Sequence, residues 1–223
     1  MKAMILSAGR GERLRPLTDH TPKPLLKAGK HRLIEYLIQS LVKAGINDII
    51  INTAHLAEQF QETLGNGQQF GANISYSPEP EAGLETAGGI INALPLLGDE
   101  AFLIVNGDIW TDFPFEQLNS FSLSTDNLAH LILVNNPEHN LKGDFSLSAG
   151  KVNQSDKVRY TYSGIGIYHP KLFSGFEVQR LALKPILLEA IEQQQLSGQL
   201  YEGVWSDIGT IERLQQLNDQ LDN

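Results

Sequence analysis

The chain opens with an apolar run that breaks into small residues and cations: Met4-Ile5-Leu6-Ser7-Ala8-Gly9-Arg10-Gly11-Glu12-Arg13. The first three of these residues are typical of a strand buried in a parallel sheet. The small residues that follow allow backbone N–H groups to approach phosphate oxygens, and the arginines add further donors. We therefore expect a buried strand that ends in a phosphate-binding loop.

Strand and helix patterns alternate after this loop. The predicted elements are, in order, helix 33–42, strand 48–52, helix 55–64, strand 72–77, helix 90–94, strand 102–105 and strand 128–134. Strands that alternate with helices predict βαβ units and a mostly parallel sheet. Because no linker or repeat interrupts the pattern, we expect one α/β domain over residues 1–223.

The pattern changes after residue 135. A turn at Ala149-Gly150 and an alternating segment over Tyr160–Tyr168 predict a small antiparallel β-hairpin beside the sheet. A helix over 180–194, a strand that ends at Trp205 and an amphipathic helix after Gly209 complete the predicted order.

Composition excludes several classes of function. The 223 residues include no Cys, so there is no disulfide, thiolate metal site or thiol nucleophile. The net charge of −9 argues against non-specific nucleic-acid binding. No apolar stretch approaches the roughly 18–20 residues of a membrane span, so we expect a cytoplasmic protein that contacts neither nucleic acid nor membrane.

The positive charge is concentrated at the start of the chain. Eight of the 17 Lys and Arg lie in residues 1–32, against only two acids in the same segment. A basic patch on an acidic chain suits a small polyanion as ligand. The alternative is a tight glycine turn with solvated arginines. The loop is neither a P-loop, since the Gly-Lys-Ser/Thr ending is absent, nor a GxGxxG motif, since Leu14 occupies its last position.

Three more residues are candidates for phosphate chemistry. Asp108 and Asp207 each follow a predicted strand, where a carboxylate could hold Mg²⁺ together with substrate phosphates. The alternatives are a turn role for Asp108 and an N-cap role for Asp207. Lys23 lies between Pro22 and Pro24, which restrict the backbone, although it could equally be a surface lysine in a proline turn.

The segment from Leu6 to Thr18, followed by Pro22-Lys23-Pro24, closely resembles the signature of the sugar-1-phosphate nucleotidylyltransferases. Later stretches look like those of the uridylyltransferases that act on N-acetylmuramate α-1-phosphate in bacterial cell-wall (peptidoglycan) recycling. These stretches are Leu84–Gly89, Asn106–Asp108, Gly143–Phe145 and Trp205–Thr210. The resemblance covers essentially the whole chain. Ser7 departs from it, because the family usually has alanine there.

The resemblance implies a Rossmann-like, three-layer αβα sandwich without the C-terminal β-helix domain of many relatives. It also implies an Mg²⁺-dependent reaction in which a sugar-phosphate oxygen attacks the α-phosphorus of UTP and pyrophosphate leaves. Nucleoside triphosphate and sugar 1-phosphate are the expected partners, and a monomer is the working expectation.

Site residues follow from the resemblance position by position. The expected triphosphate-binding residues are Ala8, Gly9, Gly11, Glu12, Arg13 and Lys23. The expected catalytic residues are Arg13, Lys23, Asp108 and Asp207, with the two aspartates as Mg²⁺ ligands. Either Glu79 or Glu81, with the backbone near Gly88, would face the base. The expected sugar-binding residues are Asn106, Asp144, Ser163 and Gly164.

Two other functions fit parts of this pattern. The same loop and aspartates would serve a mannose- or other hexose-1-phosphate nucleotidylyltransferase that uses GTP or another triphosphate. A non-catalytic nucleotide sensor would need only the binding loop. The full set of Arg13, Lys23, Asp108 and Asp207 favours an enzyme over a sensor.

Overall fold

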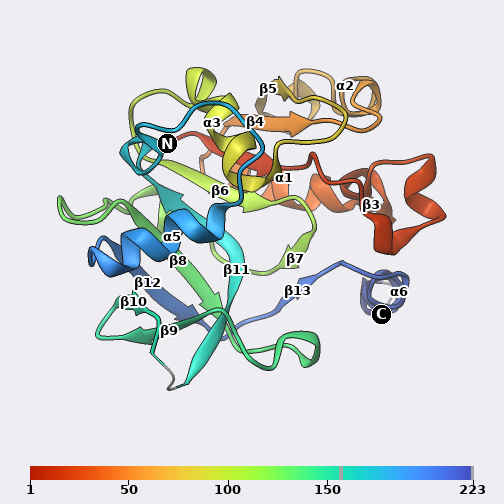
Figure 1. The fold of residues 1–223 in the computed structure, drawn as a ribbon. Coiled ribbons are helices and arrows are strands. Elements are labelled where there is room, and N and C mark those ends of the chain that lie inside the picture. The colour runs from red at the N-terminus through yellow and green to blue at the C-terminus, as the bar shows by residue number, and fades with distance from the viewer. Residues whose placement is uncertain (156–157, 222–223) are drawn as a thin grey trace.

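The computed structural model describes residues 1–155 and 158–221, and its elements follow a mixed α/β order (Figure 1). The strands are β1 (Ala3–Leu6), β2 (Lys27–Ala28), β3 (His31–Arg32), β4 (Asp48–Thr53), β5 (Asn73–Pro78), β6 (Phe102–Asn106), β7 (Ile109–Thr111), β8 (Ala129–Val134), β9 (Phe145–Ser148), β10 (Lys151–Asn153), β11 (Arg159–Tyr168), β12 (Leu196–Tyr201) and β13 (Trp205–Asp207). The α-helices are α1 (Leu33–Lys43), α2 (Glu58–Leu64), α3 (Glu85–Leu97), α4 (Glu116–Asn119), α5 (Leu183–Glu192) and α6 (Ile211–Leu221).

Nine strands form one sheet in the order β5-β4-β1-β6-β11-β8-β12-β10-β9. The pairs β5–β4, β4–β1, β1–β6 and β8–β12 are parallel. However, β11 pairs antiparallel with both β6 and β8, in the middle of the sheet. The predictions of a mostly parallel sheet and of a Tyr160–Tyr168 strand in a hairpin beside it were therefore wrong. The sheet is mixed. The prediction failed because the alternating pattern of β11 does not specify which strands β11 will join.

The far end of the sheet curls into a small closed barrel. The predicted turn at Ala149-Gly150 joins β9 to β10, so that part of the hairpin is confirmed. In addition, β9 pairs with β11 through Ser146 and Phe145, which closes the ring β11-β8-β12-β10-β9. The register of β11 against β8 shifts between Tyr162 and Ile165. A bulge of this kind bends a strand and lets one strand serve both sheet and barrel.

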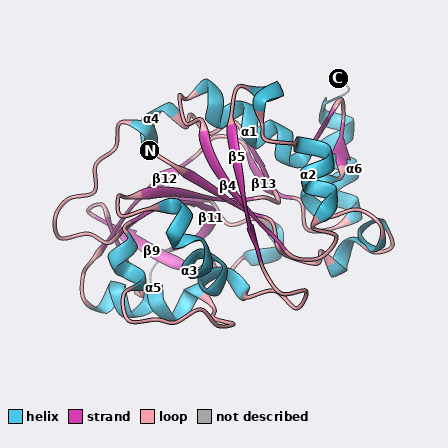
Figure 2. Ribbon diagram, turned by 90° about the horizontal axis from the view of Figure 1, so that it is seen from above, coloured by secondary structure: helices cyan, strands magenta, loops and turns pink. Residues whose placement is uncertain are grey.

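Helices cover both faces of the sheet, as Figure 2 shows from above. Successive side chains of a strand point to opposite faces, so Met4 and Ile5 enter different cores. Ile5 packs in the core that includes residues of α1 and α2, whereas Met4 packs in the core that includes residues of α3 and α5. The continuous apolar runs of β1, β4 and β6 follow from this burial on two sides.

A third, smaller core joins the two ends of the chain. Leu14 and Leu33 pack there with Leu214 and Leu217 of α6. The backbone N–H of Gly29 also donates to Asn218 Oδ1 at 2.8 Å. Figure 1 shows α6, in blue, beside the red N-terminal segment. The loop that follows β1 is therefore held partly by residues almost 200 positions later.

Two predicted helices begin later than expected. α2 starts at Glu58 rather than at residue 55, and α5 starts at Leu183 rather than at residue 180. The residues before α5 are held against α3, because Leu181 N–H donates to Leu84 O while Leu181 O accepts from Ala87 and Gly88. These bonds prevent an earlier start of α5.

Within the described residues, no helix is long and apolar enough to cross a membrane. The prediction of one domain over residues 1–223 stays a prediction, and its positions 156–157 and 222–223 lie outside the described residues.

Candidate active site

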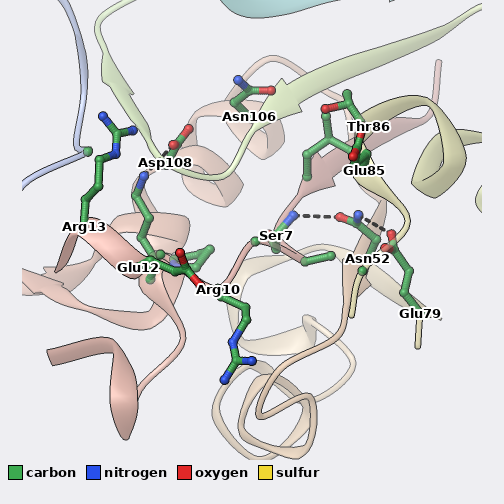
Figure 3. A pocket seen from close by; sticks show the side chains of 18 of the residues that line it. Ser7, Arg10, Glu12, Arg13, Asn52, Glu79, Glu85, Thr86, Asn106 and Asp108 are labelled. Carbon is green, nitrogen blue, oxygen red and sulfur yellow. Dashed lines mark hydrogen bonds and ion pairs between the residues drawn. The ribbon is translucent and has the colours of Figure 1, made fainter. Parts of the chain in front are cut away.

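A cavity of about 530 Å³ opens at the carboxyl ends of the parallel strands β1, β4, β5 and β6 (Figure 3). Open α/β sheets bind ligands at this edge. The cavity is lined by residues 6–13, Lys23, Pro24, Asn52, Glu79, Ala82, Gly83, Glu85, Thr86, Asn106, Asp108 and Gly209. The structure thus brings together most of the predicted phosphate-binding residues.

The loop after β1 contains two glycines in different surroundings. Gly11 has φ of 65°, and a Cβ there would lie 3.0 Å from both Lys23 Cβ and Thr18 Cγ2. Its carbonyl accepts bonds from Leu14 N–H and the Thr18 hydroxyl, at 2.8 and 2.9 Å. A Cβ on Gly9 would meet nothing within 4 Å in the part of the chain that the structure describes. Gly11 is therefore required by the protein itself, whereas the space beside Gly9 is open for a ligand.

Lys23 and Asp108 meet at one side of the cavity. Lys23 Nζ donates to Asp108 Oδ2 at 2.5 Å, and the lysine side chain is only 10% exposed. Pro22 and Pro24 flank the lysine at the short 3₁₀ turn that begins there. The predicted alternative of a solvated surface lysine is wrong, because the ammonium is held against a strand-end carboxylate.

Asp207 is the last residue of β13, which pairs with β7, and β7 begins directly after Asp108. β13 pairs antiparallel with β7 so that Asp207 faces Ile109, and Ile208 N–H donates to Asp108 O at 2.7 Å. The backbones of the two aspartates are therefore close across this short ladder, although Asp108 lines the cavity and Asp207 does not. Asp207 Oδ1 accepts from Arg213 Nη1 at 2.5 Å and lies 2.9 Å from His139 Nε2.

Arg13 approaches this second aspartate at Gly209. A Cβ on Gly209 would lie 3.0 Å from Arg13 Nη2 and 3.1 Å from Asp207 Oδ2. Arg213 Nη2 would be closer still, so a side chain at position 209 would disrupt the cluster. Sequence reasoning missed Arg213 and His139, because nothing in their local pattern indicates that they reach Asp207.

The donor atoms of the two aspartates fit Mg²⁺. Each carboxylate bonds a cationic side chain through one oxygen, and within the described residues Asp108 Oδ1 and Asp207 Oδ2 accept no protein hydrogen bond. Mg²⁺ prefers one or two carboxylates and completes its shell with phosphates and water. No group of three or more His, Cys, Asp or Glu is placed to hold a metal in the described part of the chain, so an ion here would need ligands from the substrates.

A hydrogen-bond chain supports the opposite side of the cavity (Figure 3). Ser7 N–H donates to Asn52 Oδ1 at 2.7 Å, and Asn52 Nδ2 donates to Glu79 Oε1 at 2.6 Å. Glu79 Oε2 accepts from Leu84 N–H at 2.8 Å. Glu79 lines the cavity, whereas Glu81 is exposed and outside its lining. Sequence reasoning missed Asn52, although its place at the end of a buried strand is the same signal that marked Asp108.

Gly88 is predicted to face the base, but it lies outside the cavity lining. Its N–H donates to Leu181 O at 3.1 Å, and a Cβ there would lie 2.1 Å from Gln179 O. The glycine allows the segment before α5 to pack directly on α3. Gly88 therefore packs against the segment before α5 and against Leu84.

A second cavity of about 420 Å³ adjoins the first and shares Glu85, Thr86 and Asn106 with it. Its other lining residues are Asp144, Phe145, Tyr162, Ala182, Leu183, Lys184 and Leu187. Asp144 Oδ2 accepts from Tyr162 N–H at 3.0 Å and from Asn140 Nδ2 at 3.3 Å. The predicted sugar-binding residues Asn106 and Asp144 therefore line one cavity.

The other two predicted sugar-binding residues line neither cavity. Ser163 is buried, donates to Ile132 O at 2.7 Å and accepts from Ile165 N–H at 3.1 Å. Gly164 has φ of 80°, and a Cβ there would lie 2.5 Å from Asn106 Nδ2. The two residues support the strand and the Asn106 side chain behind the cavity wall.

Residues 2–143 match the family model described as nucleotidyl transferase. The chain belongs to the nucleotidyl transferase family. It is 50% identical over 222 residues to the N-acetylmuramate α-1-phosphate uridylyltransferase of Neisseria meningitidis serogroup B, covering 97% of this chain and 96% of that protein. It is 32% identical to a mannose-1-phosphate guanyltransferase of Gibberella zeae, over 94% of this chain but only 61% of that protein.

Two solved structures share this fold. A protein from Bacillus anthracis assigned as a glucose-1-phosphate thymidylyltransferase matches with a TM-score of 0.88 and 25% identity, covering 100% of this chain and 96% of that chain. The inositol-1-phosphate CTP transferase of T. maritima matches with a TM-score of 0.79 and 17% identity, and that likeness shows the fold alone.

Proposed function

We propose that the protein joins UTP to N-acetylmuramic acid α-1-phosphate, which yields UDP-N-acetylmuramic acid and pyrophosphate for peptidoglycan recycling. The observation that carries this proposal is the 50% identity, over 97% of the chain, to a protein that bears this activity in its name. The geometry supports it, because Arg13, Lys23 and Asp108 line one cavity beside a second that offers room for a sugar.

The reaction is a substitution at phosphorus. An oxygen of the sugar phosphate attacks the α-phosphorus of UTP, and the bond between that phosphorus and the oxygen bridging to the β-phosphate breaks. The departing oxygen leaves on pyrophosphate, so no proton transfer is needed. Such a step depends on alignment and on neutralising phosphate charge.

The cations of the cavity supply that neutralisation. The open backbone beside Gly9, with Ala8, Gly11 and Glu12, would hold the triphosphate, and Arg13 would balance charge on the leaving pyrophosphate. Lys23 would bridge the sugar phosphate and the α-phosphate. Its ammonium is already fixed by Asp108, so little side-chain entropy would be lost when substrates bind.

Asp108 and Asp207 would hold Mg²⁺, which when bound neutralises phosphate oxygens. The same carboxylates also position the cations around them. Asp108 fixes Lys23, and Asp207 fixes Arg213 beside Arg13. Both aspartates thus act on the phosphates through protein side chains as well.

The remaining predicted residues divide between base and sugar. Glu79 fits the base side better than Glu81, because it lines the first cavity. Asn106 and Asp144 would bind the sugar, while Ser163, Gly164 and Gly88 would position the walls.

We interpret the two helix-covered faces as the layers of a Rossmann-like sandwich. We place the reaction in the cytoplasm, where UTP is available.

Pyrophosphate release tests the proposal. The purified protein is incubated with Mg²⁺ and each pair of one nucleotide (UTP, GTP, CTP or dTTP) and one acceptor. The acceptors are the 1-phosphates of N-acetylmuramic acid, N-acetylglucosamine and mannose. We expect UTP with N-acetylmuramic acid α-1-phosphate to give the highest kcat/KM, and EDTA to abolish turnover.

Preference for GTP with mannose 1-phosphate would instead establish the alternative enzyme. UTP binding without pyrophosphate release from any pair would indicate a nucleotide sensor.

A further inference from the structure

The second cavity contains a cation that the proposed chemistry has not used. N-acetylmuramic acid differs from other hexose substrates by a carboxylate on the lactyl ether at C3. We propose that Lys184 binds this carboxylate and so selects the acceptor. The inference rests on the proposed function, because the lactyl group is specific to that acceptor.

Charge distribution favours Lys184 for this role. It is the one Lys or Arg among the described residues that line the second cavity. Nearby Arg180 is already paired with Glu85, with 2.9 Å between Nε and Oε1. Arg10, Arg13 and Lys23 line the first cavity, where the phosphates would lie. Among the described residues, no ion pair engages Lys184.

The backbone at Lys184 is held in place by buried neighbours and by backbone hydrogen bonds. It lies in the first turn of α5, between Leu183 and Leu187, which are 7% and 2% exposed. Leu181, three residues before it, is anchored to α3 by its backbone hydrogen bonds. The ammonium therefore extends from a rigid wall, while its methylene stem can cover the apolar residues beside it. Such a wall also suits the lactyl methyl group.

The two carboxylates that line the second cavity, those of Asp144 and Glu85, already have hydrogen-bond or ion-pair partners in the protein. Asp144 accepts from Tyr162 N–H and Asn140, and Glu85 pairs with Arg180. Their carboxylates suit sugar hydroxyls and the acetamido N–H, and would repel a second carboxylate. Burial raises the pKa of Tyr162 well above its usual value, and its hydroxyl bonds that of Tyr168, so it adds no anion. A lactyl carboxylate is therefore best placed at the Lys184 end.

Kinetics of Lys184→Gln test this assignment. With UTP saturating, we expect the KM for N-acetylmuramic acid α-1-phosphate to rise roughly five- to tenfold, the range of an exposed to partly shielded charged hydrogen bond. The kcat should stay within about twofold, because Lys184 does not contact the reacting phosphates. N-acetylglucosamine 1-phosphate lacks the carboxylate, so any turnover with it should be unchanged. Lys184→Arg should restore much of the affinity.

Lys171→Gln is the matched control, since Lys171 is exposed and lines neither cavity. An unchanged KM in Lys184→Gln, with wild-type turnover of N-acetylmuramic acid α-1-phosphate intact, would overturn this inference alone. Equal loss with both acceptors would assign Lys184 a structural role and would also overturn it. If the wild-type protein does not use N-acetylmuramic acid α-1-phosphate, the proposed function falls and this inference falls with it.

Discussion

Lys23 Nζ lies 2.5 Å from Asp108 Oδ2, although 85 positions separate the two residues. The pair joins the segment after β1 to the segment after β6, and β1 and β6 are neighbouring parallel strands. Each side chain therefore holds the other in place. Under the proposed function each also acts at the phosphates, Lys23 directly and Asp108 as a ligand of Mg²⁺. Substitutions around this pair should separate folding from catalysis.

Replacing Asp108 by Asn should lower kcat by about 10²–10³, which is typical for the loss of one electrostatic contact in a transition state. The amide can still accept from Lys23, so the melting temperature should change little. Asp126→Asn, at an exposed position, is the control. Turnover equal to that of the wild type would remove Asp108 from the mechanism.

Gly9→Ala and Gly11→Ala should behave differently. A Cβ at position 9 meets no atom of the described residues within 4 Å, so folding should be unaffected while UTP binding weakens by about tenfold or more through lost backbone contacts. A Cβ at position 11 would contact Lys23 and Thr18 at 3.0 Å in a left-handed conformation. Gly11→Ala should therefore also lower the melting temperature. Calorimetric UTP titration and thermal unfolding measure the two effects, and tight UTP binding by Gly9→Ala would count against the loop as phosphate site.

Ser7→Ala should stabilise the protein. The Ser7 hydroxyl is buried and has no hydrogen-bond partner among the described residues, and an unsatisfied buried polar group costs about 1–3 kcal/mol. Its removal should raise the melting temperature by roughly 2–4 °C, because about 1 kcal/mol corresponds to that shift in a chain of this size. A lower melting temperature would show that the hydroxyl has a partner when the protein is in solution.

Gly88→Ala should distort the wall of the second cavity without contacting the ligand. The new Cβ would lie 2.1 Å from Gln179 O, a backbone atom, so the segment before α5 must move. We expect a loss of about 1–3 kcal/mol in unfolding free energy, the range for overpacking. The KM for the sugar phosphate should rise, since Ala182, Leu183 and Lys184 follow that segment. Urea unfolding and steady-state kinetics measure both, and unchanged values would mean that the packing is looser than observed.

His130 should make stability depend on pH. Burial lowers the pKa of this histidine below its usual value of 6.5, and the hydrogen bond to Gln199 Oε1 partly opposes the shift. The unfolded chain therefore binds more protons than the folded one below about pH 6.5, so stability should fall as pH drops through that value. The unfolding free energy of His130→Asn should vary less between pH 7.5 and 5.5, whereas His20→Asn, at an exposed position, should follow the wild type. Parallel pH profiles for all three proteins would rule out His130 as the cause.

Local patterns predicted most of the elements. The apolar runs of β1, β4 and β6, the amphipathic α1 and the strand-end position of Asp108 follow from side-chain periodicity and turn residues within short segments. Strand partners do not follow from such patterns. β11 reads as one arm of a hairpin, yet it joins β6 to β8 and closes the barrel with β9, because pairing depends on distant segments.

The sequence by itself determined the residue types of the site and the small, basic loop after β1 that we propose to bind phosphate, since small residues, glycines and cations are recognisable wherever they occur together. Only the tertiary structure decided which groups meet. It paired Lys23 with Asp108, placed Glu79 rather than Glu81 at the cavity, and brought Arg213 and His139 to Asp207. The physical reason is that hydrogen bonds and ion pairs form over about 3 Å, and only the fold brings residues such as Lys23 and Asp108, 85 positions apart, that close.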